Sequence, residues 1–259
     1  MTKIFNRLKY KHNQSRKSGI LSTLFFVVLG LIAFFVVVNI ADLFSGFISG
    51  KGTLLYGDNI KISNTVLYGV CMGQFNNEGD AESCAASVKQ QGGAGYINQA
   101  GDYFVYASMY DSYSDATSVK KKLTDDGMDV KIINISIPAV HFNFSGNTKL
   151  ILSALNSFKD LYMCLYQTGI SYDGGTITAE QAKSQIAAQL SGIKTVYNSL
   201  KNLNTSDQKV KLIASALSEA AVLTDMLNTV STAGYNFNSE IKNTYFEIIF
   251  CEIALCKAL

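Results

Sequence analysis

The sequence predicts an α+β protein in three parts: an N-terminal transmembrane helix, a ferredoxin-like βαββαβ domain and an all-α helical bundle. Three observations lead to this prediction. Residues 18–41 contain no charged residue, residues 66–134 repeat one pattern with an offset of 35 residues, and residues 147–259 place apolar side chains at helical spacing. Each unit of the repeat is predicted to form a strand, a helix and a second strand. Two such units give a single sheet that two helices cover on one face.

The N-terminal region has the features of an uncleaved membrane anchor. Residues 1–17 carry six basic residues and no acidic one, which predicts a cytoplasmic tail. The 21 residues from Ile20 to Ile40 are almost wholly apolar, and as a helix they would span ~31 Å, close to the ~30 Å hydrocarbon core of a bilayer. A cleaved signal peptide has a shorter apolar run and a small-residue site after it, which residues 42–52 do not offer. We therefore expect a single-pass protein of the cell membrane, with a transmembrane helix at 18–41, a linker at 42–63 and the remaining domains outside the cytoplasm.

Composition argues against several classes of function. The net charge is +2 and no basic cluster lies within a predicted folded domain, so nucleic acid is not an expected partner. The five cysteines are widely spaced, which predicts free thiols rather than a disulfide framework or a zinc site. The only histidines are His12 and His141, too few for a catalytic zinc site or a nucleophile–histidine pair. The acidic residues that a glycan hydrolase would need look like turn and cap residues. We expect no enzyme activity, no metal and no cofactor.

The repeat between residues 66 and 134 needs no gap. Its matched pairs include Tyr68 with Tyr103, Val70 with Val105, Phe75 with Tyr110, Asp80-Ala81 with Asp115-Ala116, Val88 with Leu123, Gly92 with Gly127 and Ile97 with Ile132. The first unit predicts a strand at 68–75, a helix that ends at Gly92-Gly93, and a strand at 94–98. The second predicts a strand at 103–110, a helix at 114–126 that stops at Gly127, and a strand at 128–137.

The repeat resembles a known family. The run 68–75 (YGVCMGQF) with Asp80-Ala81 and Gly92, and the run 103–110 (YFVYASMY) with Asp115-Ala116 and Gly127, resemble the two halves of the SPOR (sporulation-related repeat) domain. The resemblance covers about residues 64–138. It implies a non-catalytic peptidoglycan-binding module, often tethered by one transmembrane helix, that recognises glycan strands stripped of their stem peptides.

Strand alternation predicts which face of the sheet would receive the glycan. Val70, Met72, Val105 and Ala107 are expected to point to the helices. The open face then carries Gly69, Cys71, Gly73, Phe104, Tyr106 and Ser108, with Tyr96, Lys131 and Ile133 beside them. Aromatic rings suit the apolar faces of sugars, and polar side chains at the end of the first strand supply hydrogen bonds. The predicted glycan-binding residues are Cys71, Gln74, Asn76, Tyr96, Phe104, Tyr106, Ser108 and Lys131.

A second interpretation assigns the same face to packing. The family commonly has glutamine at the position of Cys71 and basic side chains near Phe104 and Tyr106, so this face is more apolar than usual. Apolar faces mark interfaces in general. The alternative function is a membrane-anchored interaction or scaffold protein, whose SPOR-like sheet packs on its own helices or on a partner protein.

The C-terminal part is predicted to be helical after a linker at 139–146. Four helical stretches follow: two with apolar stripes from Leu150 and from Ala182, a third that begins at Thr205, and a fourth at 239–257. Thr178 with Gln181, and Thr205 with Gln208, have the spacing of capping boxes. Short loops between the stripes favour an antiparallel bundle at 147–259, which is expected to pack on the sheet, dimerise or hold a protein partner. Together these features predict a membrane-anchored, non-catalytic protein that binds peptidoglycan glycan in cell division, sporulation or cell-wall organisation.

Overall fold

The computed structural model describes residues 58–203, 205–234 and 236–259. The predicted cytoplasmic tail, the predicted transmembrane helix and residues 42–57 of the predicted linker lie outside these ranges. Among the described helices, none combines the length and the apolar character that crossing a bilayer requires.

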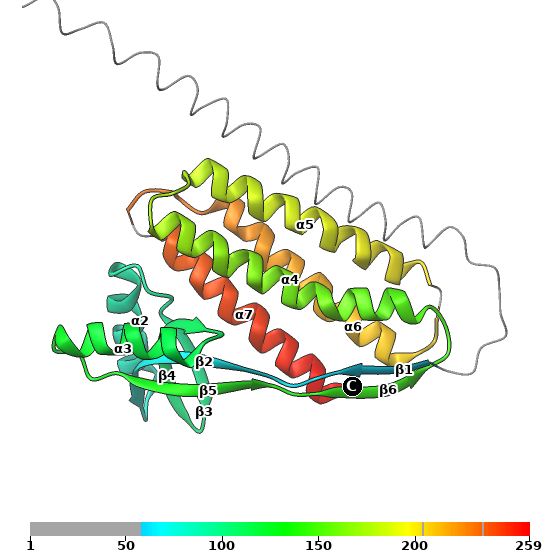
Figure 1. Cartoon of the computed structure of the whole chain (residues 1–259), viewed down its shortest axis with the longest axis horizontal. Coiled ribbons are helices and arrows are strands. Elements are labelled where there is room, and N and C mark those ends of the chain that lie inside the picture. Colours follow the sequence, from blue (N-terminus) through cyan, green and yellow to red (C-terminus); the bar gives the residue numbers. More distant parts are fainter. Residues whose placement is uncertain (1–57, 204, 235) are drawn as a thin grey trace, which may run out of the picture. The chain divides into compact units, whose positions relative to one another are not determined.

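Residues 65–137 fold in the predicted βαββαβ order (Figure 1). The elements are β2 (Thr65–Phe75), α2 (Glu78–Gln90), β3 (Tyr96–Ala100), β4 (Asp102–Tyr110), α3 (Tyr113–Asp125) and β5 (Lys131–Ile137). They form a four-stranded antiparallel sheet in the order β3-β4-β2-β5. The α+β class and the βαββαβ order of elements are therefore confirmed.

Both helices of this domain begin and end at residues that the sequence marks. Asn77 and Ser112 are the N-caps, and each side chain accepts a hydrogen bond from the backbone N–H three residues later. Gly92 (φ 80°) and Gly127 (φ 85°) adopt the left-handed backbone just after α2 and α3, as predicted. The helices cover one face of the sheet through small residues. Ala81, Ala85 and Val88 pack against Val105, and Ala116 packs with Val70 and Val130.

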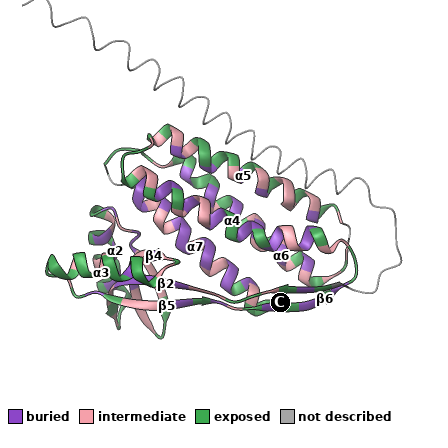
Figure 2. Cartoon of the chain, viewed as in Figure 1, coloured by how far each residue is buried: buried purple, intermediate pink, exposed green. Residues whose placement is uncertain are grey.

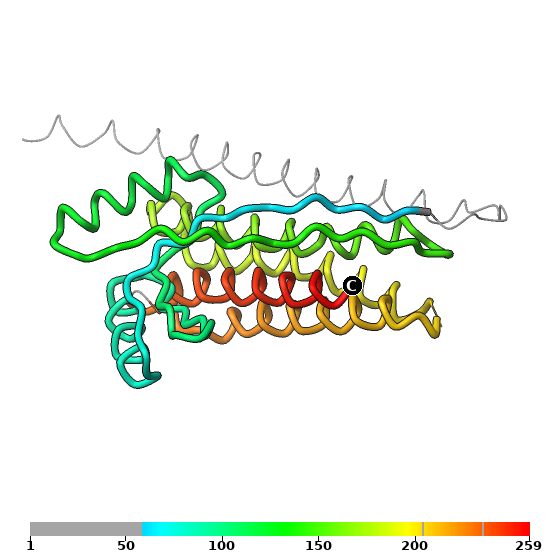
Figure 3. Tube along the Cα trace, turned by 90° about the horizontal axis from the view of Figure 1, so that it is seen from below, coloured from blue at the N-terminus to red at the C-terminus, as the bar shows by residue number. Residues whose placement is uncertain are grey.

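Two segments predicted as linkers are strands instead. Strands β1 (Asp58–Ile62) and β6 (Val140–Phe144) form a two-stranded antiparallel ribbon. The register of β1 with β6 continues that of β2 with β5, so the pairs form one long ladder interrupted at Pro138 (Figure 3). Proline lacks the N–H that a ladder needs, which explains the interruption. Val140, Phe142 and Phe144 are buried while His141 and Asn143 are exposed, an alternation typical of a half-buried strand.

The four predicted helices are present as α4 (Thr148–Asp173), α5 (Ala179–Lys201), α6 (Gln208–Met226) and α7 (Asn236–Ala258), with a short 3-10 turn η1 (Leu227–Thr229) after α6. Thr178 forms the predicted capping box with Gln181. The second predicted box is wrong, because α6 starts later: its N-cap is Asp207, and Thr205 Oγ1 instead accepts a hydrogen bond from the Asp207 N–H. Aspartate is as good an N-cap as threonine, so the helix begins at the site nearer its first apolar residue.

The helical bundle and the sheet share one hydrophobic core. Sheet residues such as Leu67, Tyr106 and Ile135 belong to the same buried cluster as the apolar faces of α4 to α7. Residues 55–259 accordingly form one compact unit. The buried residues run through the helical bundle as well as along the strands (Figure 2). The sheet therefore has helices on both faces, α2 and α3 on one and the bundle on the other.

Candidate functional site

The face of the sheet opposite α2 and α3 is covered at one end and uncovered at the other. Along β2, Leu67 and Cys71 are buried, whereas Gln74 is exposed. Along β5, Ile137 and Ile135 are buried, Ile133 is half-buried and Lys131 is exposed. The boundary between the covered and the uncovered end lies at the same level on three neighbouring strands, because Cys71 of β2 pairs with Tyr106 of β4 and with Lys131 of β5.

Helix α7 covers the buried end through aromatic stacking. The ring of Tyr96 lies parallel to the rings of Phe246, at 5.0 Å and 9°, and Phe250, at 5.3 Å and 18°. Tyr106 is 2% exposed and lies 5.4 Å from Phe246. The prediction of an open face is therefore wrong for this half, where the alternative interpretation, packing on the chain's own helices, applies. The physical reason is that Tyr96 presents an apolar ring that a phenylalanine covers as well as a sugar would.

Burial also changes the chemistry of the covered side chains. It raises the pKa of Tyr96 and of Tyr106 to about 12 in each case, because the charged phenolate is disfavoured away from water. For Tyr96 the nearby Glu247 carboxylate adds a smaller contribution of the same sign. Burial raises the pKa of the Cys71 thiol too. The covered half is thus a neutral packing surface.

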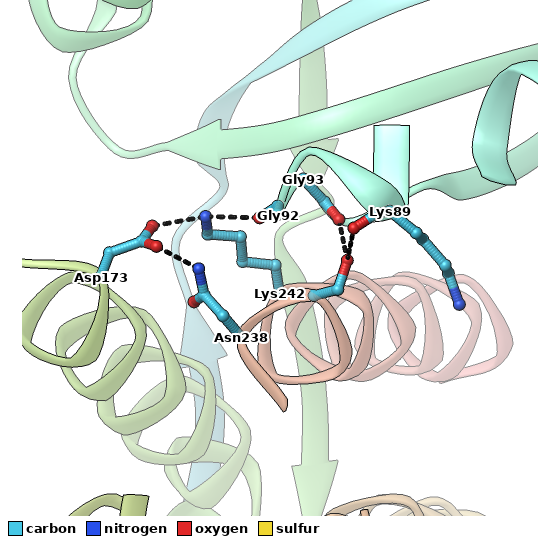
Figure 4. Close-up of polar contacts among 7 residues, drawn as sticks. Lys89, Gly92, Gly93, Asp173, Asn238 and Lys242 are labelled. Atoms are coloured by element: carbon cyan, nitrogen blue, oxygen red, sulfur yellow. Dashed lines mark hydrogen bonds and ion pairs between the residues drawn. The ribbon is translucent and has the colours of Figure 1, made fainter. Parts of the chain in front are cut away.

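A polar network fastens the SPOR-like domain to the bundle beside this aromatic contact (Figure 4). It joins Lys89, Gly92, Gly93, Asp173, Asn238, Ser239 and Lys242. Lys242 Nζ donates to the Gly92 carbonyl at 2.8 Å and to Asp173 Oδ2 at 2.5 Å. Lys242, on α7, thereby places a positive charge just beyond the C-terminal end of α2, where a helix carries partial negative charge.

The uncovered end of the face forms a groove of about 660 Å³, within the range of small-ligand sites. Its lining residues are Cys71, Met72, Gly73, Gln74, Phe75, Asn76, Asp102, Phe104, Asp129, Lys131 and Ile133. The half-buried ring of Phe104 lies on the strand opposite Gln74. Around it stand exposed polar groups: the amides of Gln74 and Asn76 and the ammonium of Lys131. An apolar ring bordered by donors and acceptors is the arrangement that holds a sugar.

The eight predicted glycan-binding residues thus divide into separate groups. Five line the groove: Cys71, Gln74, Asn76, Phe104 and Lys131. Tyr96 and Tyr106 lie under α7. Ser108 lies apart, in a small pocket of about 70 Å³ that α4 and α7 also line.

Irregular pairing explains the position of Ser108. Between β2 and β4 the register shifts twice, at Val70/Cys71 and at Cys71/Gly73. As a result Ser108 pairs with Val70, a residue of the face that α3 covers, and Gln74 pairs with Phe104. A bulge reverses the alternation beyond it, so strict alternation from one end of a strand assigns later residues to the wrong face.

Two groove residues were not predicted, Asp102 and Asp129. Asp102 follows Gly101, whose φ of 83° makes the tight turn between β3 and β4. Alternation places Asp102 on the face of Phe104, two residues on, so the sequence did contain a signal for it. Asp102 accepts a hydrogen bond from Gln74 Nε2 at 2.5 Å.

The groove has the chemistry of a binding site. It offers an aromatic ring, two amides, two carboxylates and one ammonium group. Within residues 58–203, 205–234 and 236–259, no three His, Cys, Asp or Glu side chains converge to hold a metal ion. The groove's groups can orient and hydrogen-bond a polar ligand.

Comparison with known proteins identifies the domain that carries this groove. Residues 64–134 match the family model of the SPOR domain. Searches of curated proteins and of solved structures yield no match for the chain. The matched range contains β2, β3, β4 and both covering helices, and it ends within β5. Residues 64–134 of this chain are therefore a SPOR domain, a binding domain of the peptidoglycan-recognising type.

Proposed function

We propose that this chain is a membrane-anchored, non-catalytic protein that binds the glycan strands of peptidoglycan, in the form without stem peptides, during division, sporulation or cell-wall organisation. One observation carries the proposal: the SPOR domain keeps a groove at the end of the sheet that α7 leaves uncovered. Five of the residues expected to contact glycan line it, so the loss of Tyr96 and Tyr106 to the internal interface still leaves a ring and polar groups for a sugar.

A pelleting experiment tests this function. The full chain, solubilised in mild detergent, is mixed with wall sacculi before and after an amidase has removed the stem peptides. We expect the chain to sediment with both, and more with the stripped sacculi. Lys131→Ala is expected to reduce sedimentation, because it removes the ammonium of the groove. Lys121→Ala is the matched control, since it removes another exposed lysine, from α3 on the opposite side of the sheet. Equal binding by the two variants would contradict the proposal that glycan binds in the groove.

The covered half of the sheet favours a second candidate function. The stacking of Tyr96 on Phe246 and Phe250 shows the SPOR sheet used as a packing surface, which suits a scaffold whose partner binds the helical bundle. The same experiment separates the two candidates, because a folded scaffold that does not bind glycan stays in the supernatant with either type of sacculus.

The membrane anchor makes its own prediction, from the uncharged stretch 18–41 behind a basic tail. Epitope tags are placed at each end of the chain, and protease is added to intact cells whose wall has been opened. We expect the C-terminal tag to be digested and the N-terminal tag to be protected. A C-terminal tag that survives the protease would overturn the proposed topology.

A further inference from the structure

A group of lysines lies at the end of the helical bundle where β1 begins. Figure 1 shows β1 and β6 at this end and α2 and α3 at the other. Asp58 pairs with Phe144 there, and α4 begins shortly after Phe144. The first turn of α6 lies beside β6, because Lys209 Nζ is 4.5 Å from the centre of the Phe142 ring. We call this end, which the end of α5 completes, the basal end, and its lysines are Lys149, Lys201, Lys209 and Lys211.

The basal lysines have no carboxylate partners. Among the described residues, the ion pairs involve other lysines: Lys89 with Glu240, Lys194 with Asp225 and Lys242 with Asp173. Segments 58–62, 140–159 and 190–218, which build the basal end, contain two acidic residues, Asp58 and Asp207. The Asp207 side chain is the N-cap of α6 and accepts a hydrogen bond from the Lys209 N–H. The basal end therefore carries an excess of positive charge.

Helix stability does not account for this charge. Lys149 is in the first turn of α4, and Lys209 and Lys211 are in the first turn of α6. Neither helix has an acidic residue in its first turn. The N-terminus of a helix carries partial positive charge, so the helix macrodipole disfavours a lysine there. An anionic partner would offset this unfavourable placement.

The length of chain before β1 indicates which anionic partner is near. Sixteen residues, 42–57, separate the proposed transmembrane helix from β1. Even fully extended they would reach at most ~58 Å. Helix α4, with 26 residues, is itself ~39 Å long, and the groove lies beyond the other end of the bundle from β1. The bilayer surface is therefore within easier reach of the basal end than of the groove.

Building on the proposed membrane anchor, we infer that the basal end docks on anionic phospholipid headgroups of the membrane that holds the anchor. Each lysine near an anionic bilayer surface gains about a fivefold preference for it. Docking holds the bundle with β1 toward the bilayer and the groove away from it. A glycan site then faces the space beyond the membrane, where the wall lies.

The test reconstitutes the full chain into phosphatidylcholine vesicles with and without anionic phosphatidylglycerol. A membrane-impermeant reagent acetylates exposed lysines, and mass spectrometry gives the labelling of each relative to Lys131 of the groove. Copies that face the vesicle interior do not affect this ratio, because it is taken within one molecule. The anionic lipid is expected to lower the labelling of Lys149, Lys201 and Lys211 about fivefold. Salt at about 1 M, which shortens the Debye length to ~3 Å, should restore it.

Two variants of equal charge separate docking from general attraction, with the exposed Lys61 of β1 as the reporter. In the wild-type chain the anionic lipid should protect Lys61 as well. Replacing Lys149, Lys201 and Lys211 by glutamine should abolish this protection. The matched control replaces three lysines of α3, at the other end of the bundle, and should keep it: Lys120→Gln, Lys121→Gln and Lys122→Gln.

The outcomes distinguish the inference from the proposal on which it rests. Labelling of the basal lysines that is equal in both vesicle types would overturn the docking while the anchor stands. So would an equal loss of Lys61 protection in the two variants. A chain that fails to float with neutral vesicles has no anchor, which would end the anchor and the docking together, whereas glycan binding is decided separately by the sacculi.

Discussion

Replacing Phe246 by alanine is expected to lower the free energy of unfolding of residues 55–259, the compact unit, by about 3–5 kcal/mol. The Phe246 ring is 0% exposed and touches both covered tyrosines of the sheet, Tyr96 and Tyr106. Its removal leaves a cavity at the point where α7 meets the SPOR domain. The measurement is chemical denaturation followed by circular dichroism. A loss below about 1 kcal/mol would mean that α7 does not hold the sheet in this way.

Phe237 supplies the matched control for this contact. It is also 0% exposed and on α7, but its aromatic neighbour is Tyr172 of α4 rather than a residue of the sheet. Phe237→Ala should cost a similar amount. Only Phe246→Ala should couple to Tyr96→Ala, with a coupling energy of about 0.5–1.5 kcal/mol for the stacked pair, because the interaction is lost once either ring is absent.

Glu252 is expected to make the stability of the same unit depend on pH. This α7 carboxyl is 8% exposed, and its Oε2 has no hydrogen-bond partner. Burial raises its pKa from 4.5 to about 7, against a smaller opposing effect of Lys159. Below pH 4.5 the group is protonated in the folded and the unfolded chain alike. As pH rises from 4.5 to 7 the unfolded chain releases the proton first, so stability falls, by about 3 kcal/mol in total, and levels off above pH 7.

The Glu252→Gln variant isolates this effect, since glutamine has the same shape and does not titrate. We expect the difference in unfolding free energy between the variant and the wild type to be constant below pH 4 and to grow in favour of the variant up to pH 7. Denaturation curves at pH 4, 5, 6, 7 and 8 measure it. A difference that does not change across this series would show that Glu252 is not buried as a neutral acid.

Phe246 and Glu252 bear on function because both belong to α7, the helix that covers part of the sheet. Phe246 of this helix is 0% exposed, and Tyr106 of the sheet, against which it packs, is 2% exposed. Fully burying each such side chain contributes ~1.5–3 kcal/mol, so lifting α7 off the sheet would cost far more than a glycan contact returns. The covered half of this face is therefore an internal interface, and the glycan contacts that we propose are left to the groove around Phe104.

Much of the fold was determined by local sequence patterns. The 35-residue repeat predicted the βαββαβ order, Gly92 and Gly127 predicted where two helices end, and Thr178 predicted the start of α5. These features act over a few residues, through backbone conformation and nearby hydrogen bonds, so they can be read without knowing what lies across the molecule. The alternation of Val140, Phe142 and Phe144 was equally local, and its signal for β6 was available in the sequence.

The candidate site was decided differently. Tyr96, Phe104 and Tyr106 have the same character in the sequence, namely aromatic residues at strand positions of one face. Only the tertiary structure separates them, because Phe246 and Phe250, about 150 residues later, stack on Tyr96, whereas Phe104 is half-buried at the edge of the same core and lines the groove. The two register shifts in β2 and β4 then turn Gln74 to this face, where Asp102 meets it. The sequence by itself determined that a SPOR sheet with an aromatic face would form. Which half of that face stays uncovered depended on packing between distant segments, since an apolar ring carries no local signal of what will cover it.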